Sequence, residues 1–312
     1  MRILLSQSKI DVNSRSNKYA WTPLYIAARH GDKEVVKLLL QHPETEINAQ
    51  MWDGTNALIG AVKKRHSSVV EILIHHPSIK INTGDGIFVI KNALSTAAWY
   101  GYKEIVEILV QHPEININVC PSPLSGAAWH GHTEIVEILL RHPNINVNIK
   151  DTEGRTPLHK ASDRGNKEII KLLVKQPGIK LNEKDKRNET PLYIAAFNGY
   201  KEIVETLIQQ PEIDVNVRNI DGETPLYAAA KNGWKKIVEL LTQQSKTNLN
   251  AKNKNGLTPL YIASHWHDEE IVKILVQRSG IDIESAVRTA KIKGDQKALE
   301  ILKKCGKNLQ CS

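Results

Sequence analysis

The stretch Gly154-Arg155-Thr156-Pro157-Leu158-His159-Lys160-Ala161 decides the fold, because its pattern returns along the whole chain. Five of the seven spacings between the leucines of this pattern are 34 residues. A repeat of about 20 to 50 residues indicates a solenoid, in which each unit buries its apolar side against its neighbours. Function is then expected on an extended surface. The leucines are Leu24, Leu58, Leu94, Leu124, Leu158, Leu192, Leu226 and Leu260.

One repeat predicts two short helices joined by a turn. Thr156 is a good N-cap, and Gly165 suits the left-handed end of a helix that runs from Pro157 to Arg164. Residues 169–174 then place apolar side chains at helical spacing, and Pro177 ends this second helix. The polar residues between one repeat and the next have turn compositions, so each unit is expected to project a short finger.

The motif Thr156-Pro157-Leu158-His159-x-Ala161 resembles the signature of the ankyrin repeat family, and the resemblance covers nearly the whole chain. It implies an all-α repeat solenoid, an ankyrin-type stack of helix-turn-helix units with short β-turn or hairpin fingers. The chain departs from the family where the signature histidine is replaced by tyrosine. These tyrosines are Tyr25, Tyr193, Tyr227 and Tyr261.

The repeats predict a single solenoid over residues 1–312. Its parts are a half repeat and finger (1–21), about eight repeats (22–284), a short C-terminal capping repeat (285–305) and a tail (306–312). The chain opens inside a second helix, whose first helix is missing. Either the sequence is a fragment of a longer array, or something covers this end, or the half repeat is tolerated and frays.

Composition places the chain among globular proteins, with 41% hydrophobic and 24% charged residues and no apolar stretch of membrane-spanning length. Cys120, Cys305 and Cys311 have no metal-site spacing, and the start is too weakly apolar for a signal peptide. We therefore expect a cytoplasmic or nuclear monomer. The net charge is +8, and residues 288–307 are the most cationic part. This segment either attracts nucleic acid or an acidic partner, or serves as a solvated cap.

Motifs for chemistry are missing from the sequence. It has no phosphate loop, dinucleotide fingerprint, nucleophile elbow or metalloprotease helix, so we expect no enzyme, no catalytic residues and no cofactor. Histidines recur beside the proline that follows the second helix, but successive helices lie about 8 to 10 Å apart. Such a spacing is too wide for neighbouring rungs to share a metal, and we expect no metal site. The histidines are His42, His76, His112 and His142.

The spacing of the repeats is irregular on both sides of the third repeat, which carries Leu94. Most fingers have 10 residues between their leading asparagine and the next signature leucine, but Asn82 to Leu94 is 12 and Asn118 to Leu124 is 6. The lengthened finger carries the apolar run Gly86-Ile87-Phe88-Val89-Ile90, where other fingers are polar.

The first helices next to these irregular fingers are also unusual, because tryptophan stands near the end of two successive first helices. The resemblance implies that this side of the helices and the finger tips form a concave, partner-binding face. We therefore predict a partner-binding site with exposed aromatic anchors. Alternatively, the apolar finger folds over the space left by its shortened neighbour and hides both tryptophans. The predicted site comprises Phe88, Trp99, Tyr100, Trp129 and His130, with Phe197 as an extension.

The favoured function is non-catalytic binding of another protein through the concave face. An alternative is recognition of a nucleotide or nucleic acid, with Trp99, Trp129 and Phe197 stacking on bases. Cations near these rings would then contact phosphates, and binding would be steeply sensitive to salt. These cations are Arg29, Lys63 and Lys231.

Two repeats lack the glycine that should end their first helix. Arg65 and His267 stand at that position. A left-handed residue there costs about 1 kcal/mol or more for a side chain other than glycine, unless the turn is rebuilt.

Overall fold

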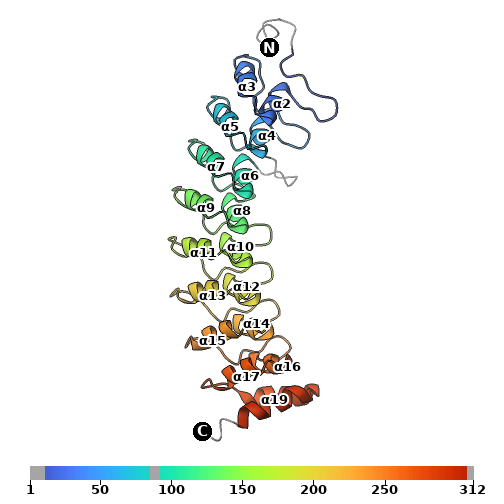
Figure 1. Ribbon diagram of the computed structural model, residues 1–312, viewed down its shortest axis with the longest axis vertical. Coiled ribbons are helices and arrows are strands. Elements are labelled where there is room, and N and C mark those ends of the chain that lie inside the picture. Colours follow the sequence, from blue (N-terminus) through green and yellow to red (C-terminus); the bar gives the residue numbers. More distant parts are fainter. Residues whose placement is uncertain (1–10, 85–91, 308–312) are drawn as a thin grey trace. The chain divides into compact units, whose positions relative to one another are not determined.

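The computed structural model describes residues 11–84 and 92–307. The chain divides into two compact units, Met1–Asp151 and Thr152–Ser312. Within the described residues all regular secondary structure is helical. Each repeat contributes a first helix with an even number and a second helix with an odd number, as Figure 1 shows.

The first unit holds four helix pairs among its described residues. They are α2 (Pro23–His30) and α3 (Lys33–Leu40), α4 (Ala57–Lys63) and α5 (Ser67–Ile74), α6 (Ala93–Tyr100) and α7 (Lys103–Val110), and α8 (Pro123–His130) and α9 (Thr133–Leu140). Its first helices stack on one another, and its second helices form a parallel row beside them (Figure 1).

The second unit holds five helix pairs among its described residues, and the last pair has the longest helices. They are α10 (Pro157–Arg164) and α11 (Lys167–Leu173), α12 (Pro191–Asn198) and α13 (Lys201–Ile208), α14 (Pro225–Lys231) and α15 (Lys235–Gln243), α16 (Pro259–His265) and α17 (Glu269–Val276), and α18 (Ile283–Lys293) and α19 (Gln296–Lys307). The first eight helices repeat the arrangement of the first unit.

The helix boundaries follow from local chemistry, and α10 confirms the sequence prediction at both ends. The Thr156 hydroxyl accepts a hydrogen bond from the backbone N–H of His159, and Pro157 is the first helical residue. Gly165 ends the helix in the left-handed region, with φ 74°. Each end is determined by residues within one turn, which explains why a short sequence window suffices to place it.

The core of each unit lies between the two rows of helices. In α10 and α11, Leu158, Ala161, Ile169 and Leu173 are fully buried. Each helix has only 7 or 8 residues, too short to be stable alone in water. The repeats are therefore stabilised by burial against their neighbours.

Asparagines at the start of the fingers join successive repeats. The amide of Asn216 donates to the carbonyl oxygen of Lys246 at 2.7 Å, and its Oδ1 accepts from the N–H of Asn248 at 2.7 Å. The same two-bond contact recurs within both units. It is made by Asn13, Asn48, Asn82, Asn118, Asn182, Asn216 and Asn250. Each asparagine thus satisfies one donor and one acceptor of the next repeat's backbone.

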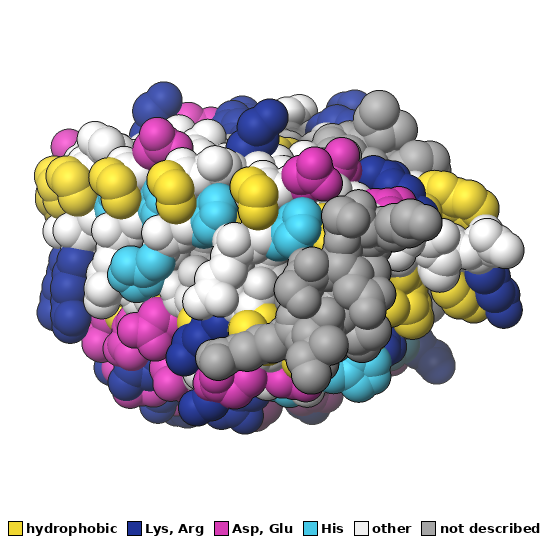
Figure 2. Space-filling view, turned by 90° about the horizontal axis from the view of Figure 1, so that it is seen from above, with side chains coloured by type: hydrophobic (Ala, Val, Ile, Leu, Met, Phe, Trp, Pro, Cys, Tyr) yellow, Lys and Arg dark blue, Asp and Glu magenta, His cyan; other side chains and the backbone are white. Residues whose placement is uncertain are grey.

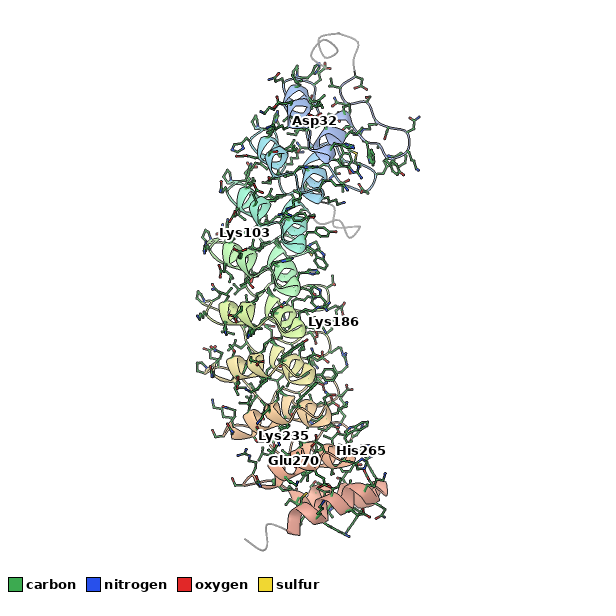
Figure 3. All side chains as sticks on the ribbon, viewed as in Figure 1. Asp32, Lys103, Lys186, Lys235, His265 and Glu270 are labelled. Atoms are coloured by element: carbon green, nitrogen blue, oxygen red, sulfur yellow. The ribbon has the colours of Figure 1, made fainter. Side chains whose placement is uncertain are left out.

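The finger tips of the second unit are also hydrogen-bonded to each other. The N–H of Lys186 donates to the carbonyl of Glu153 at 2.9 Å, and the N–H of Ile220 donates to that of Arg187 at 2.8 Å. The second helices α15 and α17 are joined by an ion pair, in which Glu270 lies 3.0 Å from Lys235 (Figure 3). Glu270 also lies 2.9 Å from Lys273 of its own helix. Hydrogen bonds from these two lysines lower the pKa of Glu270 to about 2.

Glycines at the ends of first helices also make room for a ring from the next repeat. The indole of Trp234, the residue before α15, lies against Gly199, and its Nε1 donates to the carbonyl of Phe197 at 2.8 Å. In the first unit His132 lies against Gly101 in the same way, and its Nε2 donates to the carbonyl of Trp99 at 3.2 Å. Such a ring satisfies a carbonyl at a helix end that has no partner within the helix.

The two repeats without this glycine keep the left-handed turn. Arg65 has φ 60° and His267 has φ 61°, so the turn is not rebuilt around the larger residue. The guanidinium of Arg65 lies 5.7 Å from the ring centre of Tyr102, a cation–π contact that offsets part of the strain.

We expect the His267→Gly substitution to stabilise the second unit by about 1 kcal/mol, because glycine adopts φ 61° without a steric penalty. Urea denaturation followed by circular dichroism measures the change. Arg65→Gly provides the comparison, since it also removes the contact with Tyr102 and should give a smaller gain. A loss of stability in His267→Gly would contradict this account of the turn.

Candidate functional site

The predicted partner-binding residues of the first unit lie at the C-terminal ends of two adjacent first helices. Trp99 and Tyr100 end α6, and Trp129 and His130 end α8. Tyr100 is 55% exposed and His130 is exposed, whereas both tryptophans are half-buried. The rings of Trp99 and His130 meet edge to face, with their centres 4.4 Å apart. The fold therefore places these four side chains together, and the ring of His130 covers part of Trp99.

The other two predicted residues lie apart from this group in the chain. Phe88 falls in residues 85–91, outside the described residues, as does most of the apolar finger that the alternative interpretation invokes. Phe197 belongs to the second unit, where it stands near the end of α12 and is 44% exposed. Its ring stacks on that of Tyr193, with the centres 6.2 Å apart.

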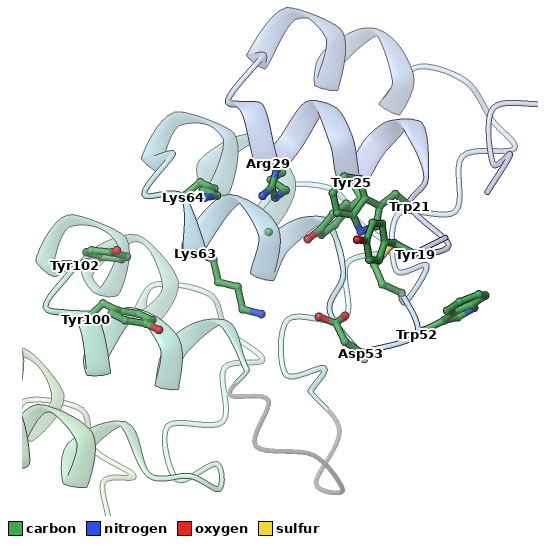
Figure 4. A pocket seen from close by; sticks show the side chains of 12 residues that line it. Tyr19, Trp21, Tyr25, Arg29, Trp52, Asp53, Lys63, Lys64, Tyr100 and Tyr102 are labelled. Atoms are coloured by element: carbon green, nitrogen blue, oxygen red, sulfur yellow. The ribbon is translucent and has the colours of Figure 1, made fainter. Parts of the chain in front are cut away.

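A pocket of about 700 Å³ opens on the first unit, beside the ends of α2, α4 and α6 (Figure 4). We call it the aromatic pocket. Arg29, Lys63 and Lys64 contribute three cations to its lining, and Asp53 contributes one carboxylate. Met51 and Gly60 complete it. Its six aromatic side chains are Tyr19, Trp21, Tyr25, Trp52, Tyr100 and Tyr102.

The aromatic side chains form two groups on opposite sides of the cations, as Figure 4 shows. In one group Trp21 stacks on Tyr19 with the ring centres 5.0 Å apart, and Tyr25 lies 5.6 Å from Trp21. In the other, Tyr100 stacks on Tyr102 at 5.7 Å. The pocket is therefore walled by rings that hold each other in place.

Glycine at position 60 gives the pocket part of its depth. A Cβ atom at Gly60 would lie 2.8 Å from Cε2 of Tyr25, closer than side chains pack. Apart from Gly126 in α8, the other first helices carry larger residues at the equivalent position, for example Ile26 and Ile194. The missing side chain at Gly60 lets the Tyr25 ring lie against α4.

The cations of the aromatic pocket have no ion-pair partner among the described residues. Across residues 11–84 and 92–305, no carboxylate forms an ion pair with Arg29, Lys63 or Lys64. Arg29 instead lies 5.2 Å from the ring centre of Trp21. Asp53 is directed to its own finger, where it accepts a hydrogen bond from the backbone N–H of Thr55 at 3.0 Å. The pocket thus presents free positive charge beside apolar rings.

A second pocket, of about 330 Å³, lies on the second unit and has the opposite character. Its cations are paired. Arg155 lies 3.2 Å from Asp185 and 3.4 Å from Asp163, and Lys231 lies 3.0 Å from Glu223. We call this the polar pocket, and its charges are compensated within the protein.

Burial shifts the titration of groups in the polar pocket. The pKa of Glu189 is raised chiefly by burial, against the lowering effect of Arg187. The pKa of Tyr193 is raised by burial and by its hydrogen bond to Glu223, at 2.8 Å. The hydroxyl of Tyr193 also accepts a hydrogen bond from the amide of Asn219 at 2.9 Å. Tyrosine in place of the family's signature histidine therefore connects a first helix to the next finger.

Sequence reasoning missed most of the aromatic pocket. It identified Tyr100, and it named Arg29 and Lys63 only for the nucleic-acid alternative. Tyr19 and Trp52 are 45% and 73% exposed and belong to fingers, most of which are polar elsewhere in the chain. Aromatic residues in two consecutive fingers were the signal that could have identified it.

Figure 2, seen from above, shows hydrophobic side chains exposed beside Lys and Arg side chains at the right-hand edge of the view.

In the part of the chain that the structure describes, no three potential ligands gather to hold a metal ion. Nor does any described helix have the length and apolar character needed to cross a membrane. Histidines beside the prolines have a structural role, as in His112, whose Nδ1 accepts a hydrogen bond from the N–H of Glu114 at 3.2 Å.

Comparison with known proteins supports the repeat architecture. A family model described as ankyrin repeats (3 copies) matches residues 1–85, 79–151, 124–219 and 212–287. No curated protein matches the chain. Ankyrin repeats are generally non-enzymatic modules for protein–protein interaction. With a match over most of its length and paired helices in every described repeat, the chain belongs to the ankyrin repeat family.

Proposed function

We propose that this chain is a non-catalytic module that binds another protein through the face formed by the ends of its first helices and its fingers. The observation that carries the proposal is the gathering of exposed aromatic side chains on this face of the first unit. Tyr19, Trp52 and Tyr100 are all substantially exposed around one pocket. Aromatic anchors of this kind dominate the energetics of protein interfaces.

The predicted residues Trp99, Trp129 and His130 extend this surface along the next helix ends. Phe197 offers a further exposed ring in the second unit. The nucleic-acid alternative is less well supported, because Lys231 is paired with Glu223 and the Phe197 ring already stacks on Tyr193. We place the protein in the cytosol or nucleus, where free thiols such as those of Cys120 and Cys305 persist.

The proposal predicts that a Trp99→Ala, Tyr100→Ala, Trp129→Ala triple variant loses its partner, since each lost anchor typically weakens binding by about 2 kcal/mol. Affinity capture from a cell lysate, with mass-spectrometric identification, compares this variant with the parent. Ile292→Ala is the matched control, because Ile292 is 79% exposed on α18, outside the proposed surface.

Proteins that the parent and the control retain and the triple variant loses would support the proposed surface. Equal retention by all three chains would refute a role for these helix ends. Capture that disappears after nuclease treatment would refute protein binding and support nucleic-acid recognition.

A further inference from the structure

The aromatic pocket has an electrostatic property that the proposed function does not explain. Arg29, Lys63 and Lys64 lie on two successive first helices or directly after them, without a carboxylate in ion-pair distance among the described residues. Lys63 and Lys64 are exposed, whereas Arg29 is half-buried against Trp21. Because the three cations line one pocket, an anion bound in it is attracted by all of them.

The polar pocket provides an internal comparison. There the equivalent face of the fold supplies its own counter-charges, and Arg155 alone lies within 4 Å of Asp163, Asp185 and Glu189. The same scaffold can therefore neutralise cations on this face. In the aromatic pocket the single lining carboxylate is Asp53, which accepts hydrogen bonds from the backbone N–H and the hydroxyl of Thr55 in its own finger. No carboxylate among the described residues therefore supplies a counter-charge to these cations.

We propose that the aromatic pocket binds an acidic peptide segment of the partner protein, in which an Asp or Glu stands beside a large apolar side chain. The carboxylate lies among Arg29, Lys63 and Lys64, and the apolar side chain packs on the rings around them. This inference rests on the proposed function, since it names the chemistry of the partner's contacting segment.

The aromatic walls favour a peptide over a nucleic acid. Base stacking needs a free ring face, but Trp21 is already contacted by the Tyr19 ring and by the Arg29 guanidinium. Tyr102 is likewise stacked on Tyr100 and contacted by Arg65. The exposed Trp52 and Tyr100 offer apolar contact area at the rim for a partner side chain.

The test uses a phage library of random dodecapeptides, selected on the full-length chain. Enriched peptides are synthesised with a fluorescein label, and their affinities are measured by fluorescence anisotropy. Each peptide is paired with a version in which Asp and Glu become Asn and Gln. A labelled oligothymidylate serves as the nucleic-acid probe.

Three protein variants accompany the parent chain. The charge variant is Arg29→Gln, Lys63→Gln, Lys64→Gln. Its matched control, Lys33→Gln, Lys167→Gln, Lys175→Gln, removes the same number of positive charges at exposed positions away from the pocket. Trp52→Ala tests the contact between the pocket's rings and the apolar side chain of the peptide. The Trp52 side chain is 73% exposed and therefore contributes little to folding. Circular dichroism establishes that each variant is folded.

We expect the enriched peptides to carry an acidic residue next to an apolar one. Their binding should weaken about tenfold or more in the charge variant and for the amide peptides, but not in the control. Trp52→Ala should weaken it about fivefold or more.

Two results would overturn the inference, and they differ in what they mean for the proposed function. Peptides that bind equally well to the parent and the charge variant would refute the acidic-segment site, while protein binding by the chain would stand. Tighter binding of oligothymidylate than of any peptide, lost in the charge variant, would overturn both.

Discussion

Replacing Gly199 with alanine is expected to destabilise the second unit by about 3 kcal/mol. Gly199 has φ 83°, where a side chain costs about 1 to 2 kcal/mol. A Cβ atom would also lie 2.7 Å from the Trp234 indole, and overpacking of this kind typically costs about 1 to 3 kcal/mol. The indole would have to move and give up its hydrogen bond to the carbonyl of Phe197.

Gly178→Ala separates the two contributions. Gly178 has φ 73°, but nothing lies within 4 Å of the position that its Cβ would take. It should therefore show only the conformational cost, about 1 to 2 kcal/mol. Urea denaturation followed by circular dichroism gives both values, and tryptophan fluorescence reports on Trp234. Equal losses in the two variants would show that the packing of the ring on Gly199 contributes nothing.

Replacing Asn219 with leucine is expected to cost about 3 kcal/mol. Asn219 is buried, and its Oδ1 accepts hydrogen bonds from the N–H groups of Asp221 and Glu223, both at 2.9 Å. Its amide donates to the hydroxyl of Tyr193. Leucine leaves these groups without their partner, and each unsatisfied buried group costs about 1 to 3 kcal/mol.

Asn219→Asp is the informative control, because it keeps the oxygen that both backbone groups use. The preceding finger naturally carries Asp185 at this position, where Oδ1 accepts from the N–H groups of Arg187 and Glu189. We expect Asn219→Asp to recover most of the lost stability. Denaturation measures the total effect, and hydrogen exchange of the Asp221 and Glu223 amides measures the finger alone. Unchanged exchange in Asn219→Leu would contradict the role of this side chain.

The helix pairs of the regular repeats could be predicted, because their determinants are local. The helix from Pro157 to Arg164 begins at a threonine cap and ends at a glycine, and both signals act within one turn. Arg65 and His267 show how strong the repeat context is, since both adopt the left-handed conformation that glycine occupies elsewhere. Packing of the neighbouring repeats holds them there at the cost of local strain.

The candidate site was predictable only in part. Trp99 and Trp129 were identifiable from their position in the repeat, but the structure shows in addition that the His130 ring of the next repeat covers part of Trp99. The aromatic pocket was not predicted, because it combines Tyr19 and Trp52 from two fingers with Tyr100 from α6. A periodic pattern specifies which positions face the same side, but it does not specify which side chains from different repeats meet.

The sequence by itself determined the repeat, the helix pairs and the ankyrin repeat family, since caps, glycines and apolar spacing act over a few residues. Only the tertiary structure decided which charges remain uncompensated. Arg155 and Arg29 both stand near first helices, yet one is surrounded by carboxylates from the next finger and the other by rings. Coulombic and packing interactions depend on distances between repeats, and folding alone establishes these distances.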